Sequence, residues 1–106
     1  MTDYTDEEMK TICSTIVQQL GGMGRLKSFV NAKNFTYDKK TCSMVFQFSV
    51  SKKCNLIRIT LNSMDLYDLE FMKIGKEVKT VSKVDDVYND MLISTFESET
   101  GLYLHF

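Results

Sequence analysis

The stretch "SMVFQFSV", residues 43–50, decides the fold because apolar and polar side chains alternate along it. One set of positions carries Met44, Phe46, Phe48 and Val50, and the positions between them carry Val45, Gln47 and Ser49. Successive side chains of a β-strand point to opposite faces of the sheet. The alternation therefore predicts a strand with one buried face.

Similar alternation on both sides of this segment predicts a sheet. Further strands are expected at "SFVNAKNF" (28–35), "NLIRITLN" (55–62), "DLYDLEFMKI" (65–74) and 77–81. The first of these is the weakest, with only Phe29 and Phe35 in phase, and Gly75-Lys76 turns the chain into the last. Short polar turns join the strands, and a parallel crossover needs about a dozen residues, so neighbouring strands should be antiparallel.

A helix is expected before the strands, over residues 5–20. Thr5 and Glu8 form the T-x-x-E capping box, in which each side chain accepts a hydrogen bond from a backbone N–H group at the helix start. The apolar side chains recur with helical spacing at Met9, Ile12, Cys13, Ile16, Val17 and Leu20.

A second helix is expected near the end of the chain, over residues 82–98. Ser82 and Asp85 form an S-x-x-D cap, and Thr100-Gly101 ends the helix. Its apolar stripe consists of Val84, Val87, Tyr88, Met91, Leu92 and Phe96. The final segment "LYLHF", 102–106, alternates again and is expected to pair with a sheet edge.

These elements predict one α+β domain over residues 1–106. An antiparallel sheet of four to five strands should be flanked by an N-terminal and a C-terminal helix packed on one face. The residues expected to face the sheet are Ile12, Ile16, Leu20, Val87, Met91 and Phe96.

Composition excludes several classes of protein. The chain is 43% hydrophobic and 25% charged, which is ordinary for a globular protein and not for a disordered one. No apolar run approaches the ~18 residues of a membrane span, and the N-terminus is acidic where a secretory signal would be basic. We therefore expect a cytoplasmic protein.

Cys13, Cys42 and Cys54 lack a C-x-x-C pair, so buried thiols are expected, with no zinc site and no cofactor.

The glycine-rich stretch "QQLGGMGRLKSF", 18–29, resembles a phosphate loop only superficially. A phosphate loop leads from a strand into a helix N-terminus, whereas Gly21 and Gly22 follow a predicted helix. Their expected role is a left-handed C-cap, so one of them should have a positive φ. The nearby Arg25 and Lys27 suit the carbonyl end of that helix.

Two groups of charged residues are candidate sites. Asp65, Asp68 and Glu70 could bind a metal ion and act as acid and base in a hydrolase, but Asp68 and Glu70 equally suit a solvated strand face opposite Arg58. We favour the structural interpretation, with no catalytic residues and no metal ligands.

The second group is basic. Between Arg25 and Arg58 eight basic residues face one acid, Asp38. Arg25, Lys27, Lys33 and Arg58 could follow a nucleic-acid backbone if they form one surface, with sheet aromatics stacking on bases. Core packing is the favoured role for those aromatics, and polar turns account for Lys39, Lys40, Lys52 and Lys53. We therefore expect only weak, non-specific nucleic-acid binding.

Five segments together resemble a family of small proteins from bacteriophages and integrated mobile elements. They are "QQLGG", "NAKNF", "RITLNSMDLYDLEF", "VYNDML" and "TGLY", which span Gln18 to Tyr103. The resemblance implies a phage or prophage origin and a location in the cytoplasm of the infected cell. It implies no activity and no catalytic residue.

These observations favour a binding protein that is not an enzyme. It would act on a host or phage macromolecule, most simply a protein, and inhibition of host defence is one such role. The alternatives are a nucleic-acid-binding accessory protein using residues 25–58 and, less favoured, the hydrolase described above. Arg25, Lys27, Lys33, Arg58, Asp68 and Glu70 are the candidate binding residues. A free sheet edge would also let two copies of the chain form a homodimer.

Overall fold

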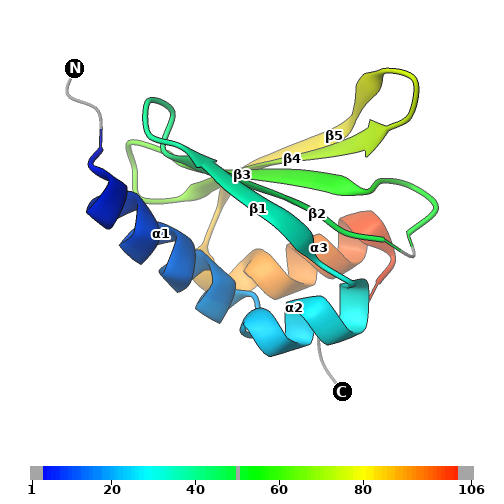
Figure 1. Cartoon of the computed structure of the whole chain (residues 1–106), viewed down its shortest axis with the longest axis horizontal. Helices are drawn as coiled ribbons and strands as arrows, with labels where there is room; N and C mark the ends of the chain where they lie inside the picture. Colours follow the sequence, from blue (N-terminus) through cyan, green and yellow to red (C-terminus); the bar gives the residue numbers. More distant parts are fainter. Residues whose placement is uncertain (1–3, 50, 103–106) are drawn as a thin grey trace.

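The computed structural model describes residues 4–49 and 51–102. Three α-helices, five strands and one 3₁₀ turn follow one another along this part of the chain (Figure 1). In order they are α1 (Asp6–Gln19), α2 (Met23–Val30), β1 (Lys33–Asp38), β2 (Ser43–Gln47), β3 (Leu56–Leu61), β4 (Tyr67–Ile74), β5 (Val78–Val87), η1 (Asn89–Met91) and α3 (Leu92–Thr100).

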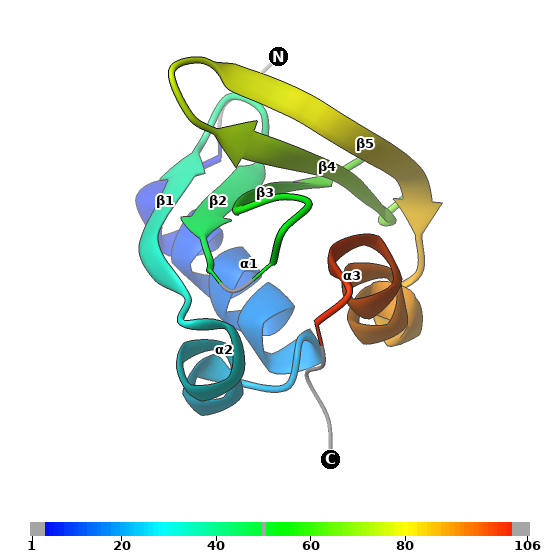
Figure 2. The ribbon, with the colours of Figure 1, turned by 90° about the vertical axis from the view of Figure 1, so that its right-hand side faces the viewer.

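The strands form one antiparallel sheet in the order β1-β2-β3-β4-β5, so each strand pairs with its neighbours in sequence. All three helices cover one face of this twisted sheet, and the opposite face is open (Figures 1 and 2). The α+β architecture expected from the sequence is confirmed, with a third helix added.

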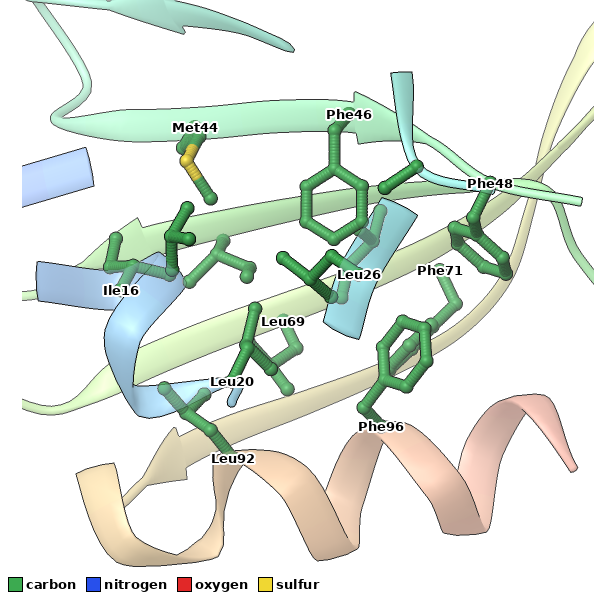
Figure 3. Packing of buried hydrophobic residues seen from close by; sticks show 14 of the residues in the cluster. Ile16, Leu20, Leu26, Met44, Phe46, Phe48, Leu69, Phe71, Leu92 and Phe96 are labelled. Carbon is green, nitrogen blue, oxygen red and sulfur yellow. The ribbon is translucent and has the colours of Figure 1, made fainter. Parts of the chain in front are cut away.

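The core lies between the sheet and the helices (Figure 3). The inward positions of the central strands supply its aromatic side chains, and Phe48 contacts Phe96 of α3 with ring centroids 5.2 Å apart. Phe46, Phe48 and Phe71 are almost completely buried. Their predicted core role is confirmed, and these rings are not available for stacking on bases.

Helix α1 begins as predicted. The Glu8 side chain accepts a hydrogen bond from the Thr5 N–H at 2.9 Å, and the Thr5 hydroxyl accepts one from the Glu8 N–H at 3.1 Å. This capping box fixes the helical phase, which turns Ile16 and Leu20 into the core, where both are fully buried. Ile12 is half-buried against the same cluster.

The glycines end α1 in the way expected. Gly21 and Gly22 have φ values of 106° and 97°, and their N–H groups donate to the carbonyls of Gln18 at 3.1 Å and Val17 at 2.9 Å. These two bonds form the Schellman motif, in which a glycine with positive φ after the cap lets the following N–H groups satisfy the last helical carbonyls.

The strand predicted over 28–35 is wrong in its first half. Gly22 also serves as the N-cap of α2, and helix α2 extends to Val30 before β1 starts at Lys33. Leu26 and Val30 are four residues apart and both buried, so they share the inward face of one helical turn. An αL residue, Asn31, ends the helix.

The helix predicted over 82–98 is wrong in its first half, because β5 continues to Val87. Tyr67 pairs with Val87 and Leu69 with Val84, so three positions on β5 match two on β4. Because of this bulge, the inward-facing residues Val84 and Val87 are three positions apart instead of two. A spacing of three is also typical of one face of a helix. Ser82 and Asp85 therefore lie in the strand and do not cap a helix.

Helix α3 starts at Leu92, with a 3₁₀ turn before it. Phe96 faces the core as predicted, and Val87 is buried as a strand residue. The prediction for Met91 is wrong, since half of its surface is exposed. Gly101 ends α3 with φ 75°, as expected.

The predicted strand over 102–106 falls, after Leu102, outside the described residues. Within the described part of the chain, none of the helices combines the length and apolar character that crossing a lipid bilayer requires.

Candidate protein-binding groove beside strand β1

The predicted carboxylates on β4 belong to the open face of the sheet. Glu70 lies opposite Arg58 in the β3–β4 register, and the two side chains form an ion pair at 3.4 Å. The other Glu70 oxygen accepts a hydrogen bond from the Thr80 hydroxyl at 2.6 Å. These contacts match the structural interpretation of Glu70 as a cross-strand partner of Arg58.

Asp68 has a structural role at the β3–β4 turn. It accepts hydrogen bonds from the Asn62 side chain at 3.0 Å and from the Asp86 N–H at 3.0 Å. Asn62 also donates to Asp86 at 2.9 Å, so the three side chains join the β3–β4 turn to the bulge in β5. Asp65 is exposed in the turn itself, with φ 61°. Among residues 4–49 and 51–102, no cluster of acidic, cysteine or histidine side chains is arranged to hold a metal ion.

The four basic residues proposed for nucleic acid are not brought together. Arg25 and Lys27 lie on α2 in the helical layer, Lys33 begins β1, and Arg58 is on the open face of the sheet. Because the helices and the open face lie on opposite sides of the sheet, these residues do not form one continuous surface (Figure 1).

A groove of about 310 Å³ lies between α1 and β1. Its walls come from one side of α1 and from the inward-facing edge of the sheet, and Met23 at the start of α2 closes one end. The lining residues are Cys13, Ser14, Val17, Gln18, Met23, Phe35, Thr36, Tyr37 and Met44. The groove is mostly apolar, with hydroxyl and amide groups at its rim.

The aromatic side chains of β1 reach the groove because of strand geometry. Phe35 stacks on Phe46 with ring centroids 4.9 Å apart, which fixes the inner wall. Tyr37 lies two residues further along on the same face, next to Met44 in the register. Its hydroxyl donates to Asp6 at 2.9 Å, and Lys39 pairs with the same carboxylate at 3.5 Å. One end of the groove is therefore tied to the start of α1.

These contacts shift the pKa of both groups in the hydrogen bond. The Tyr37 hydroxyl and the Lys39 ammonium group lower the pKa of Asp6. The same hydrogen bond to Asp6 raises the pKa of Tyr37. A negative Asp6 and a neutral Tyr37 are therefore the favoured pair at neutral pH.

Cys13 lies on the helical wall of the groove and is half-buried. Burial raises the pKa of its thiol, so the neutral form dominates at neutral pH. Burial raises the pKa of Cys42 and Cys54 as well. All three cysteines are unpaired thiols that contribute apolar surface, as the sequence predicts.

Strand β1 lies at an edge of the sheet, beside the groove. It pairs with β2 on one side, and within the described residues nothing pairs with the other side (Figure 2). A bulge interrupts the register between Lys33 and Thr36, and Asn34 there has φ 57°. Bulges blunt exposed edges, so regular pairing is confined to residues 36–38.

No motif in the sequence marks this groove. Cys13 and Tyr37 are distant in sequence, and the mistaken strand over 28–35 ended before Thr36 and Tyr37. The alternation in "NFTYD", 34–38, is the signal that would have extended β1 through them.

The chain matches no protein-family model, no curated protein and no solved structure.

Proposed function

We propose that this chain is a non-catalytic binding protein that takes an extended segment of a partner protein along β1. The observation that carries the proposal is the unpaired edge of β1 beside an apolar groove. An edge strand offers main-chain hydrogen bonds to an added strand, and an adjacent pocket selects a side chain of that strand.

The size and chemistry of the groove support a peptide side chain as its occupant. Its volume of about 310 Å³ is at the lower end for ligand pockets, which suits a single large apolar group. The bulge at Lys33–Thr36 shortens the regular edge, so backbone pairing alone would be weak. The groove therefore has to supply most of the selectivity.

The resemblance to phage and mobile-element proteins supports a host or phage protein as the partner, met in the bacterial cytoplasm. A binding protein of this kind acts by occupying its partner, and blocking a host-defence component is one such action. Nucleic-acid binding through Arg25, Lys27, Lys33 and Arg58 is not favoured, because these residues lie on separate surfaces.

The test is to fill the groove without disturbing the fold. Ser14 lines the groove and is exposed, whereas the next residue, Thr15, is exposed on α1 and does not line it. Ser14→Trp should therefore block the groove, and Thr15→Trp is a matched control on the same helix. Each tagged variant is used to capture proteins from a lysate of phage-infected bacteria, with quantitative mass spectrometry as the readout.

The expected result is a protein that the native chain and Thr15→Trp retain and Ser14→Trp loses. Equal retention by all three variants would show that binding occurs elsewhere. Loss of binding by a variant counts only if its circular dichroism spectrum and unfolding midpoint match those of the native chain. Retention of an untagged copy of the chain, and of no other protein, would instead indicate a homodimer.

A further inference from the structure

Six exposed lysines gather at one end of the sheet, away from the groove residues on α1. They come from three segments that are distant in sequence: the start of β1, the β2–β3 loop and the β4–β5 hairpin (right-hand side of Figure 1). They are Lys33, Lys52, Lys53, Lys73, Lys76 and Lys79, and we call them the lysine cluster.

Several contacts tie these segments together. The Lys73 ammonium group donates to the Lys52 carbonyl at 3.4 Å. The Asn55 side chain accepts a hydrogen bond from the Ile74 N–H at 2.7 Å and donates to the Ile74 carbonyl at 3.3 Å. The β2–β3 loop is therefore fastened to the β4–β5 hairpin, and the lysines have a common scaffold.

The cluster borders two hollows of the surface. Lys33 and Lys73 line a polar hollow of about 340 Å³, in which Gln47 and Ser49 supply further N–H and O–H donors. Lys73 also lines a second hollow, with Lys76 and Lys79 at the hairpin. Glu77 lines the second hollow as well. Because Lys73 borders both hollows, Lys33 at one and Lys76 and Lys79 at the other belong to adjoining parts of the surface.

The lysines of the cluster form no ion pair within the described part of the chain, and Glu77 is the acidic residue that lies among them in the hairpin. Lys73 and Lys79 lie directly opposite each other in the β4–β5 register, and like charges in that position are destabilising. The ion pairs found among residues 4–49 and 51–102 involve Asp6 with Lys39 and Glu70 with Arg58, and none involves the cluster. Binding of an anion would relieve this repulsion.

The acidic residues lie mostly at the opposite end of the sheet. For this reason a chain with a net charge of −1 can carry a basic region at one end. Those at the opposite end include Asp6, Glu7, Glu8, Asp38, Asp65, Asp85, Asp86 and Asp90. Three glutamates share the end with the lysines: Glu77 in the hairpin, and Glu97 and Glu99 on α3 in the helical layer. Lysines therefore outnumber acidic residues at this end of the sheet.

The chemistry of the cluster favours a phosphodiester backbone over a protein surface. Lysine is depleted in protein interfaces, whose cores rely on aromatic anchors. The exposed aromatic side chains of the described residues are Tyr4, Tyr37 and Tyr88, and all of them lie toward the other end of the sheet. Without stacking groups, single strands gain little, whereas a duplex presents densely spaced phosphates.

We propose that the lysine cluster is a second binding site, which contacts the phosphate backbone of a nucleic-acid duplex without reading its bases. This site is separate from the groove, and its existence does not depend on the proposed protein partner. Contacts by Lys, Ser and Gln to phosphates position a protein on a duplex and carry no sequence information.

The test is a fluorescence-anisotropy titration of the full chain with a short mixed-sequence DNA duplex, repeated over a range of KCl concentrations. The variant Lys33→Gln/Lys73→Gln/Lys79→Gln removes three charges from the cluster. The matched control, Lys10→Gln/Lys39→Gln/Lys40→Gln, removes three exposed lysines from the other end. Circular dichroism and an unfolding midpoint verify that each variant is folded.

The native chain should bind weakly at physiological salt, with a Kd of ~10⁻⁴–10⁻⁶ M, and more tightly as salt falls. In the cluster variant the magnitude of the log–log salt slope should drop by about 0.9 for each phosphate that is no longer neutralised. The control variant should keep the native slope, and a second duplex of different sequence should bind equally well.

Three results would overturn the proposal. The first is no binding by the native chain at low salt, and the second is an unchanged slope in the cluster variant. The third is displacement of the duplex by poly-glutamate at an equal concentration of charge, which would assign the cluster to an acidic protein. None of these results bears on the Ser14→Trp experiment, so the two sites succeed or fail separately.

Discussion

At the scale of single residues, two glycines of one short segment have different backbone conformations. Gly22 has φ 97° and ψ 158°, a region that is essentially accessible only to glycine. Gly24 lies inside α2 without a positive φ, and a Cβ built on it meets no atom within 4 Å. The clustering of glycines in sequence therefore has a structural cause at Gly22 that is absent at Gly24.

This difference predicts opposite effects of alanine. Gly22→Ala should lower the free energy of unfolding by ~1–3 kcal/mol, because alanine is strained at this φ and ψ. Gly24→Ala should raise it by up to ~1 kcal/mol, because glycine is a poor helix residue. Urea unfolding of both variants tests this. A stable Gly22→Ala variant would contradict the conformation of the α1–α2 connection.

The Asp6–Tyr37 hydrogen bond gives a pH prediction at the same scale. A lowered pKa of Asp6 stabilises the fold at neutral pH, and this contribution is lost as the pH falls through the folded-state pKa. Tyr37→Phe should move the pKa of Asp6 up toward its ordinary value, as measured by NMR titration of the side-chain carboxyl group. Tyr88→Phe, at an exposed tyrosine, should leave it unchanged.

At the scale of secondary-structure elements, the sequence correctly predicted the helices and strands in which the spacing of apolar residues is uninterrupted. Helix α1 has a capping box and a stripe from Met9 to Leu20, and inward and outward side chains alternate along most of β2 to β4, so these elements were predicted close to their observed positions. The errors occurred where the period changes. The bulge in β5 spaced Val84 and Val87 by three, and α2 has only eight residues with no side-chain cap.

Much less of the candidate site could be predicted. The Arg58–Glu70 pair followed from strand register, because both residues were assigned to the correct faces. The groove depends on how far α1 packs from β1, and the lysine cluster depends on which loops share an end of the sheet. Both are properties of tertiary packing, which no local pattern encodes.

The junction of the β3–β4 turn with β5 gives a prediction for an element. Asn62 accepts hydrogen bonds from the N–H groups of Met64 and Leu66 and donates to Asp68 and Asp86. Asn62→Asp keeps the acceptor but places a third carboxylate beside the other two. It should lower the free energy of unfolding by ~1–3 kcal/mol at neutral pH.

Acid should reduce this defect, because a protonated carboxyl group can donate again. The difference between Asn62→Asp and the native chain in urea unfolding should therefore narrow at about pH 4, near the ordinary pKa of aspartate. Asn89→Asp adds an equal charge at an exposed residue of η1 and should show no such dependence. A defect that is constant with pH would mean that repulsion between carboxylates is not its cause.

At the scale of the whole molecule, the helices cover one face of the sheet and leave two other features exposed. One is the β1 edge with its apolar groove, and the other is the lysine cluster at the end of the sheet. The two differ in chemistry, since apolar and aromatic groups line the first and ammonium groups the second. We propose a peptide strand as the ligand of the groove and a phosphate backbone as the ligand of the cluster.

We propose that a partner protein occupies the groove and the β1 edge. The most direct measurement is amide hydrogen exchange, followed by mass spectrometry, on the native chain with and without the captured partner. Backbone groups that pair with an added strand, or that a bound segment covers, exchange more slowly. We predict that the added protection falls on residues 36–38 and on the 13–18 segment of α1. Protection confined to residues 73–79, or to the open face of β3 and β4, would contradict it.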